Sequence, residues 1–471
     1  MMCDLSERCD AAIESRSQEK IDLCIEEIQL LAESNKGSLA KAQLSYYLGN
    51  LFNAKSDLSN ERTHLMNGPR PVNLMKALEH RRKSFNLSRE KEDVLHELCQ
   101  VNLSNSYFSM CRYVESLELL DGYSFENNES KYVGLCRQIF LLDQIEPMLD
   151  DDGHAEQFAM RRLDLFNRMY DERKEIQHPG VLRYISAEEN VKYNEKLTFF
   201  FKDTKRIEAL SEKPSYSPDE MSYREWCLEN RLFLNPLNII SDLWIADRDI
   251  LQFPSYMVEL NEGPYLAASF SSIKREYCFA RFLCYDGLFG HHPGYEENWL
   301  FFTNTGDEPS YGGDIEKLKV ACRLAYSVCD KLLTLLVFYV SGEKKKVYFR
   351  PREIKKIMKN QQAHPALEAL FWLSSEFGTD EKYDTGFLSE LYSFRNDLEH
   401  NYVRVCEGGS SPWDSSSDYA RTVTREELID FTFLSLSTAR SALFYLTFFV
   451  KSQEEQVEKS GYYLPNPVPY V

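Results

Sequence analysis

The sequence predicts an all-α protein whose two helical regions are separated by a linker. Apolar residues recur at three- and four-residue spacing through most of the chain, and no segment of any length shows the apolar–polar alternation of a strand. A polar stretch that carries proline and serine, "SEKPSYSPDE" at 211–220, divides the chain. We therefore expect helical hairpins over residues 1–210, a linker and irregular packing segment over 211–260, and a second helical domain over 261–471.

Composition narrows the class of protein. The formal net charge of -19 disfavours an indiscriminate nucleic-acid coat, so any RNA contact would need a local basic patch. The 12 cysteines are scattered without a C-x-x-C pair, which indicates reduced thiols and neither a disulfide scaffold nor a zinc site. The first residues lack the pattern of a secretory signal, and the longest apolar runs are about half the roughly 20 residues of a membrane span. We expect a cytoplasmic protein with no cofactor, no metal and no membrane contact.

The sequence pattern of the N-terminal region predicts helices that pack against one another. The segment "IDLCIEEIQLLAE" gathers apolar residues on one face, and small residues recur where a neighbouring helix would approach closely: Ala42, Gly49, Ala54, Ser104, Ser109 and Ser116. "LGNLF" and "LSNSYF" look like two copies of one helix type. This region resembles tetratricopeptide hairpins, although the copies lie further apart than the usual period of about 34 residues. An irregular helical bundle is the alternative.

The C-terminal half predicts helices at 265–289, 314–341, 352–377, 385–405 and 424–455. Thr424 and Glu427 have the spacing of a capping box at the start of the last helix. The aromatic and apolar segment 223–240 predicts an irregular packing element that opens this domain. "KKVYFRP" at 345–351 predicts either a short strand or an extended link.

One polar helix face stands out within "LYSFRNDLEHNYVRV" at 391–405. At 100° per residue, Arg395 and His400 lie about 140° apart with Asn396 between them, while apolar residues gather on the other side: Phe387, Leu391, Phe394, Leu398 and Tyr402. The spacing alone is weak, because Arg173 and His178 repeat it by chance. That second pair is followed by proline and lacks an amide after the arginine.

These residue types suit phosphodiester cleavage in RNA. An arginine can hold a phosphate through two parallel hydrogen bonds, and an imidazole can move a proton near neutral pH. The 2′-hydroxyl of the substrate can act as the nucleophile, so no metal is needed. The alternative is a solvated face with an Arg395–Glu399 pair, as surface helices often carry such residues.

"RNDLEH" followed by "NY" resembles the signature of the HEPN superfamily of all-helical domains. "YSVCDKLLTLL" and "HPALEALFWLSSEF" agree with it, and the likeness to a bacterial branch with tetratricopeptide-like helices spans about residues 40–450. The resemblance implies a C-terminal HEPN bundle and a metal-independent endoribonuclease toxin, used in anti-phage defence or abortive infection. It also implies a homodimer with both motif helices at one cleft. Arg395 would bind the scissile phosphate, and His400 would be the general acid/base. Asn396 would orient the phosphate or the imidazole. Some members only bind nucleotides or partners, so a non-catalytic scaffold is the alternative.

Further residues follow from the same resemblance. Tyr402 matches tyrosines that a partner nucleotidyltransferase modifies, although the helical wheel favours a core role. Asp330 and Lys331, in an otherwise apolar helix, would line the cleft or form an interface ion pair. A basic run within 343–359 predicts either RNA contact, with Tyr348 and Phe349 for stacking, or a solvated face; it comprises Lys344, Lys345, Lys346, Arg350, Arg352, Lys355 and Lys356. The N-terminal helices would sense a protein trigger or antitoxin, or restrain the toxin.

Overall fold

A computed structural model gives the fold of the chain, which is predominantly α-helical as the sequence predicts. It describes residues 2–34, 37–61, 71–89, 94–121, 125–176, 213–258, 264–291, 294–295, 312–377, 389–406, 420–456 and 462–464. The chain divides into two compact units. One contains residues 1–147 and 151–204, and the other contains 148–150 and 205–471.

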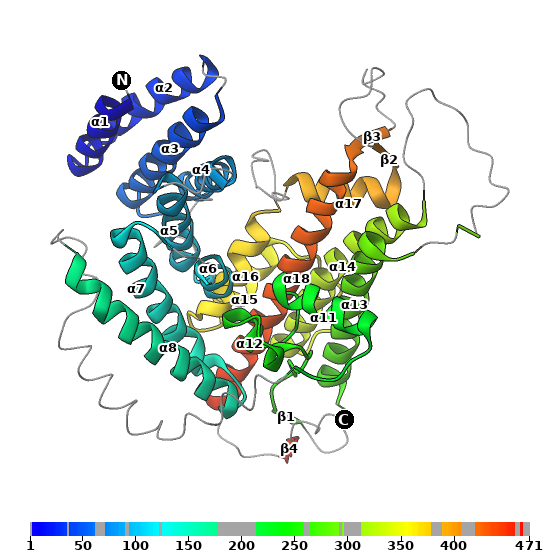
Figure 1. The fold of residues 1–471 in the computed structure, drawn as a ribbon. Coiled ribbons are helices and arrows are strands. Elements are labelled where there is room, and N and C mark those ends of the chain that lie inside the picture. The colour runs from blue at the N-terminus through cyan, green and yellow to red at the C-terminus, as the bar shows by residue number, and fades with distance from the viewer. Residues whose placement is uncertain are drawn as a thin grey trace. The chain divides into compact units, whose positions relative to one another are not determined.

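The N-terminal unit is a succession of helices in which each packs against the next along the chain (Figure 1). They are α1 (Met2–Glu14), α2 (Gln18–Ser34), α3 (Ser38–Leu58), α4 (Val72–Ser88), α5 (Val94–Ser109), α6 (Tyr113–Leu120), α7 (Asn128–Ile145) and α8 (Asp152–Glu172), with the short 3₁₀ turns η2 (Glu146–Met148) and η3 (Arg173–Glu175). Helices α5 and α6 are separated by a turn. The chain turns at Cys111, whose φ of 56° lies in the left-handed region.

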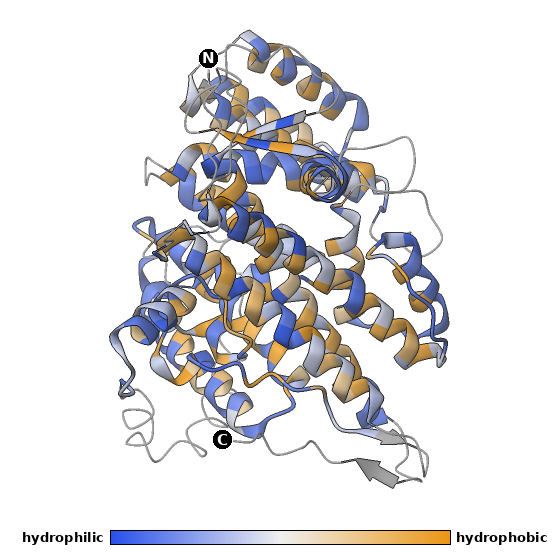
Figure 2. Ribbon diagram, turned by 90° about the vertical axis from the view of Figure 1, so that its right-hand side faces the viewer, coloured by the Kyte–Doolittle hydropathy of each residue, from blue (hydrophilic) through white to orange (hydrophobic). Residues whose placement is uncertain are grey.

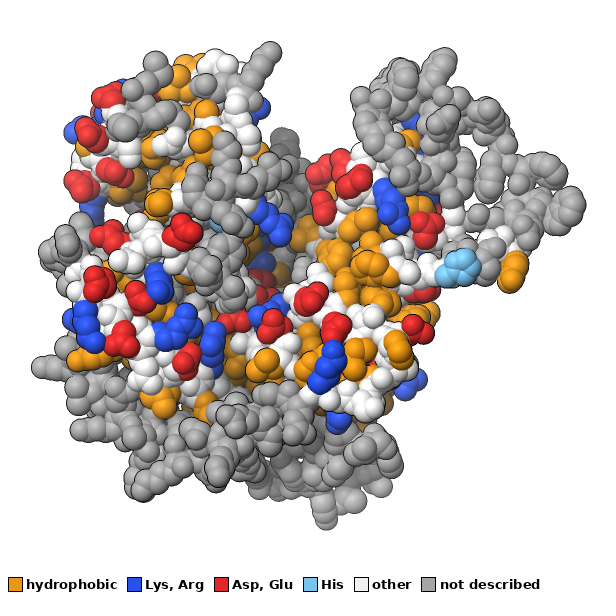
Figure 3. All heavy atoms as spheres, viewed as in Figure 1, with side chains coloured by type: hydrophobic (Ala, Val, Ile, Leu, Met, Phe, Trp, Pro, Cys, Tyr) orange, Lys and Arg blue, Asp and Glu red, His pale blue; other side chains and the backbone are white. Residues whose placement is uncertain are grey.

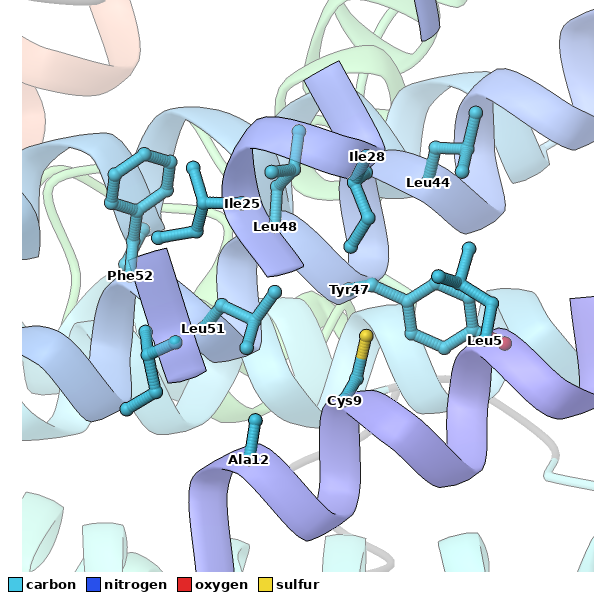
Figure 4. Packing of buried hydrophobic residues seen from close by; sticks show 12 residues of the cluster. Leu5, Cys9, Ala12, Ile25, Ile28, Leu44, Tyr47, Leu48, Leu51 and Phe52 are labelled. Carbon is cyan, nitrogen blue, oxygen red and sulfur yellow. The ribbon is translucent and has the colours of Figure 1, made fainter. Parts of the chain in front are cut away.

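The packing of this unit explains its small residues and its apolar stripes. Figure 4 shows buried side chains of α1, α2 and α3 converging on one cluster, with Cys9 and Tyr47 among them. A Cβ on Gly49 would lie 2.8 Å from Cγ of Arg81, so α3 and α4 approach too closely for any larger residue. Ser104 and Ser116 meet across α5 and α6 with hydroxyls 2.8 Å apart. The close approaches expected at Gly49, Ser104 and Ser116 are therefore present.

The C-terminal unit is built around α18 (Arg425–Gln456), most of whose middle and second half is buried. Helices α13 (Tyr265–Phe289), α14 (Gly313–Ser341) and α16 (Pro365–Ser375) pack on it, and Figure 2 shows helices with one hydrophobic and one hydrophilic face. The remaining elements are α11 (Pro218–Glu229), α12 (Leu237–Ile240), η5 (Trp244–Ala246), α15 (Pro351–Asn360) and α17 (Ser389–His400). The predicted capping box is present, because Thr424 and Glu427 exchange side-chain and backbone hydrogen bonds of 2.8 and 3.1 Å.

Several predicted boundaries are wrong for identifiable reasons. The helix expected over 352–377 is two helices, since Pro365 favours an extended residue before it and His364 adopts φ -133° and ψ 127°. Part of the expected linker is helical, because Ser217 caps α11 through the backbone N–H of Glu220. Residues 342–350 form no regular element before α15, so the extended link is the correct alternative for that segment.

The expectation that no strand competes is also wrong. The helix predicted to reach residue 405 ends at His400, and β2 (Tyr402–Cys406) follows and pairs in parallel with β3 (Ala420–Thr424). The run Tyr402–Cys406 contains two valines and a tyrosine, which favour extended structure. A second two-stranded sheet joins β1 (Tyr256–Val258) to β4 (Tyr462–Leu464) in antiparallel register.

Two helices of the described chain, α14 and α18, are long and apolar enough to span a membrane by length and composition alone. In the most apolar window of α18, 83% is buried inside the protein, as expected of a core helix, against 44% for α14. On the face shown in Figure 3, acidic and basic side chains are interspersed over the described surface. Every cysteine whose side chain the structure describes is a free thiol.

Candidate functional site

Helix α17 packs on the core through its apolar face. Phe394 is fully buried and stacks on Phe431 of α18, with ring centroids 4.6 Å apart. Arg421 of β3 covers the ring of Phe394 and forms an ion pair with Asp397 at 3.3 Å. A second pair joins Arg421 to Glu390 at 3.5 Å. The short parallel sheet therefore fixes the helix that carries the arginine and the histidine.

Arg395 is half-buried and lies over an aromatic ring. Its guanidinium carbon is 5.3 Å from the ring centroid of Tyr326 on α14, and its Nη1 donates to Oδ1 of Asn396 at 3.1 Å. Its Nε is buried without a hydrogen-bond partner among the described residues. Arg395 also forms no ion pair with any carboxylate that the structure describes. Among the residues that the structure describes, no anion therefore pairs directly with the guanidinium of Arg395.

Asp330 lies one helical turn after Tyr326 and connects the arginine with the basic segment. Its Oδ1 accepts a hydrogen bond of 2.7 Å from the backbone N–H of Phe349. Burial raises the pKa of Asp330, and this rise is partly offset by that N–H and by the charges of Arg395, Lys346 and Arg350. Asp330 thus lies within electrostatic reach of the motif arginine and of two predicted RNA-binding residues.

Lys331 has a different neighbourhood from Asp330. Its ammonium forms an ion pair with Glu276 of α13, and its side chain is about half exposed. The two residues therefore do not act as one pair. Of the two predicted cleft residues, the structure brings Asp330 to Arg395 and directs Lys331 to the neighbouring helix.

The basic segment consists of two parts with different charge balance. Lys346 and Arg350 lie 5.7 and 5.5 Å from the ring centroid of Tyr348, whose side chain is 48% exposed. Lys344 and Lys345 are exposed next to them, with Lys344 over the ring of Tyr265. Phe349, expected to stack on a base, is 2% exposed and belongs to the core.

The second part lies on α15 and is partly neutralised. Arg352 and Lys356 both pair with Glu353, at 3.3 and 2.9 Å, and Lys355 covers the ring of Phe371. The first part, around Tyr348, is therefore the better candidate for contact with a polyanion.

His400 and Tyr402 lie at the end of α17. His400 is the last residue of the helix, and its imidazole is exposed. The core role that the helical wheel favours for Tyr402 is wrong: the side chain is 49% exposed, because the helix ends before it and Tyr402 begins β2. Of the other positions on the predicted apolar side, Leu391 and Phe394 are buried as expected, Leu398 is only partly buried, and Phe387 lies outside the described residues.

Two contacts of the site have no counterpart in the sequence reasoning. The spacing of Tyr326 and Asp330, one turn apart on a predicted helix, could have signalled the tyrosine beneath Arg395. No sequence signal marks Arg421, which reaches α17 from a strand. Among the described residues, no group of three or more His, Cys, Asp or Glu side chains could hold a metal ion.

Comparison with known proteins agrees with this architecture. Residues 257–453 match the family described as LA2681-like HEPN. No curated protein and no solved structure matches the chain significantly. The matched segment begins in β1 and ends near the end of α18. It therefore contains α17, the basic segment, α14 and most of α18. This C-terminal region is therefore a HEPN domain, and the N-terminal unit that precedes it is helical.

Proposed function

We propose that the HEPN domain is a metal-independent endoribonuclease. The observation that carries the proposal is Arg395: a half-buried guanidinium, fixed over Tyr326, that no described carboxylate pairs with. A buried cation usually has a partner, so an arginine left without one is suited to an anion that arrives from outside. The exposed imidazole of His400 on the same helix supplies the proton-transfer group that a phosphate site needs for catalysis.

The proposed chemistry uses only side chains of this chain and the RNA. Arg395 binds the scissile phosphate and offsets its developing charge. Asn396 accepts from Arg395 through Oδ1, which leaves its amide N–H groups to donate to a phosphate oxygen. The 2′-oxygen attacks phosphorus, the bond to the 5′-oxygen breaks, and a 2′,3′-cyclic phosphate forms. His400 removes the 2′-hydroxyl proton or protonates the leaving 5′-oxygen.

We extend the proposal to the way the domain contacts RNA and to its oligomeric state. Lys346, Arg350 and the exposed ring of Tyr348 would follow the RNA backbone and stack on a base. His400 is exposed on the single chain, so a second copy facing it would enclose the phosphate and supply the other half of the acid–base pair. We therefore include a homodimer through the HEPN domain.

The biological role that fits is a cytoplasmic anti-phage or abortive-infection toxin. Residues 1–210 would restrain the HEPN dimer until a protein trigger binds them. An energy difference of about 1–3 kcal/mol between the two states gives a 5–150-fold switch. The exposure of Tyr402 leaves its ring accessible to a modifying partner enzyme.

The direct test is incubation of the purified protein with total RNA in the presence of a chelator. We expect fragments with 2′,3′-cyclic phosphate ends from the wild type and none from His400→Ala at equal concentration. Light scattering on the same samples should give the mass of a dimer. Uncut RNA from a folded, dimeric wild type would support the alternative of a non-catalytic scaffold.

The restraint is tested by expression of residues 211–471 with and without His400→Ala. We expect the fragment to be more toxic than the full chain and the substitution to remove the difference. A fragment that is folded by circular dichroism and dimeric, yet harmless, contradicts restraint. The N-terminal unit would then be required for activity.

A further inference from the structure

Helix α13 presents a stripe of aromatic rings to the solvent. Phe279, Phe282 and Phe289 are 54%, 45% and 62% exposed. Large apolar side chains gathered on one exposed face usually mark an interaction surface. Two of the rings are supported by neighbours, because Phe282 lies 5.7 Å from the ring of Tyr223 and Phe289 lies 5.1 Å from the ring of Tyr285. The aromatic surface is therefore already formed in the single chain.

The stripe has the spacing of a seam between two helices. Six positions of α13 recur at alternating three- and four-residue intervals, which places them on one face along about 26 Å of helix. They are Ser272, Arg275, Phe279, Phe282, Asp286 and Phe289. Asp286 is partly exposed and the other five are exposed. This alternation keeps one face of a helix turned towards a second helix, so the stripe suits a helical partner.

The stripe is complementary to itself when a second copy runs antiparallel to it. About a two-fold axis at the middle of the stripe, a cation meets an anion, a ring meets a ring, and a ring meets a small side chain. The pairs are Arg275 with Asp286, Phe279 with Phe282, and Phe289 with Ser272. The two-fold axis makes each of these matches twice, as an interface between identical chains requires.

The two charged residues can form this pair and select its direction. Arg275 is exposed and has no ion pair with any carboxylate that the structure describes. Oδ2 of Asp286 pairs with Lys317 at 2.7 Å, and the carboxylate has a second oxygen to accept from a guanidinium. A parallel pair of helices would instead place Arg275 against Arg275 of the second copy, and such like charges disfavour association.

The middle of the stripe lies level with Tyr326, the ring beneath the motif arginine. Helices α13 and α14 run antiparallel, because Glu276 pairs with Lys331 while Asp286 pairs with Lys317. Tyr326 lies between these two lysines on α14, and the middle of the stripe lies between their two partners on α13. A two-fold axis through the stripe would therefore pass at the level of the motif arginine in both copies.

We propose that the exposed face of α13 binds the same face of a second copy as an antiparallel helix pair. The inference rests on the homodimer included in the proposed function and assigns the helix and the register that form it. Burial of the phenylalanine rings drives association, and the pairs between Arg275 and Asp286 fix the antiparallel register.

The test is sedimentation equilibrium of the full-length protein, without RNA, at micromolar concentration. The wild type should be a dimer. Phe279→Glu sets a carboxylate against a ring and should raise the dissociation constant about 100-fold. Because Phe279 is more than half exposed, the variant should keep the circular dichroism spectrum of the wild type. Leu30→Glu on α2, where the side chain is 68% exposed, is the matched control and should leave the dissociation constant unchanged.

An exchange of charges tests the register. Arg275→Glu places like charges opposite each other in both pairs and should raise the dissociation constant about tenfold. Arg275→Glu combined with Asp286→Arg reverses both members of each pair and should recover most of that loss. Arg168→Glu on α8, where the side chain is 48% exposed, makes the same charge change and should assemble as the wild type does.

Three outcomes would overturn the proposal. A wild type that is monomeric at micromolar concentration would show that the face does not bind a second copy. A dimer that withstands Phe279→Glu would lie on another surface, and a charge exchange without recovery would contradict the antiparallel register. RNA cleavage is measured separately on the same samples. Uncut RNA from a wild type whose assembly responds as expected would count against the ribonuclease proposal alone.

Discussion

Arg281 on α13 and Arg395 on α17 both lie against tyrosine rings, but they differ in what neutralises their charge. Arg281 is 3% exposed and forms a two-pronged pair with Asp249, at 2.8 and 2.7 Å. Its remaining donors reach the carbonyl of Leu232 and the hydroxyl of Tyr223, both at 2.9 Å. Within the described part of the chain, Arg395 has one hydrogen bond, to a neutral amide, and its buried Nε has no partner.

The difference separates an arginine that holds the fold from one that is available to a ligand. Each nitrogen of the Arg281 guanidinium has a hydrogen-bond partner in the protein. The residue therefore fixes segment 230–250 on α13 and is not available to a ligand. The ring of Tyr326 supports the guanidinium of Arg395, and no carboxylate among the described residues pairs with it. A buried polar group that the protein leaves unsatisfied is a reasonable place to look for function.

The largest expected effect is on the rate of RNA cleavage when Arg395 or His400 is replaced. Arg395→Ala and His400→Ala should each lower the rate of RNA cleavage by roughly 10²–10⁴ and leave the denaturation midpoint almost unchanged. The rate is measured on a labelled RNA with chelator present. The matched controls, Arg173→Ala and His178→Ala, reproduce the same spacing elsewhere in the chain and should cleave at the wild-type rate. Loss of activity in the controls but not at 395 and 400 would contradict the assignment.

The second-largest expected effect is on the free energy of unfolding when the counter-ion of Arg281 is removed. Asp249→Ala leaves the guanidinium of Arg281 buried without its counter-ion, which costs about 3–5 kcal/mol of unfolding free energy. Urea denaturation measures it. Asp314→Ala is the matched control, since Asp314 pairs with Arg425 at 3.3 Å near the surface, where such pairs contribute about 0–1 kcal/mol. An equal loss of unfolding free energy in the two variants would show that the Arg281–Asp249 pair does not stabilise the fold as described.

The fold class and most helices of the C-terminal unit follow from the sequence, because their signals are local. Apolar periodicity defines α13, α14 and α18, and the capping box marks the start of the last of these. The errors arise where tertiary structure overrides periodicity. The motif helix ends at His400 because the next residues pair with a strand that begins 20 residues later, at Ala420.

The candidate site is predictable in part for the same reason. Arg395, Asn396 and His400 share one helix, so their spacing alone places them on one face. Tyr326 and Arg421 reach that helix from segments distant in the sequence, and the charge balance of Arg395 depends on which carboxylates the fold brings near. Sequence spacing contains no information on that balance.

A smaller effect is expected from the ring beneath Arg395. Tyr326→Leu removes a cation–π contact of about 0.5–2 kcal/mol, equivalent to a loss of about 2- to 30-fold in cleavage. Tyr326→Phe keeps the ring and should retain most of the activity. Rate and RNA affinity are measured separately, because a positioning role lowers the rate more than the affinity. If both variants lose activity equally, the hydroxyl and not the ring supports Arg395.

The smallest effect is the opposite pH dependence of the two aspartates beside these arginines. Burial alone would raise the pKa of Asp249, but the charge and hydrogen bonds of Arg281 outweigh burial and hold that pKa below the ordinary 3.8. Burial raises the pKa of Asp330 above 3.8, because the nearby cations compensate only partly. Asp249 therefore stabilises the fold above its unfolded pKa, and this stability is lost as pH falls through the lower folded value. Asp330 destabilises the fold while ionised, and stability is regained as pH falls through its raised value.

Urea denaturation between about pH 3 and pH 7 tests the two signs against matched variants. Asp249→Asn and Asp330→Asn remove the titration, and the second keeps an oxygen to accept from the N–H of Phe349. The stability difference between wild type and Asp249→Asn should shrink in the most acidic part of the range. The difference between wild type and Asp330→Asn should move in favour of the wild type as pH falls from neutral. Two differences of the same sign would mean that Arg395 neutralises its aspartate as fully as Arg281 does, and the contrast between the two arginines would fail.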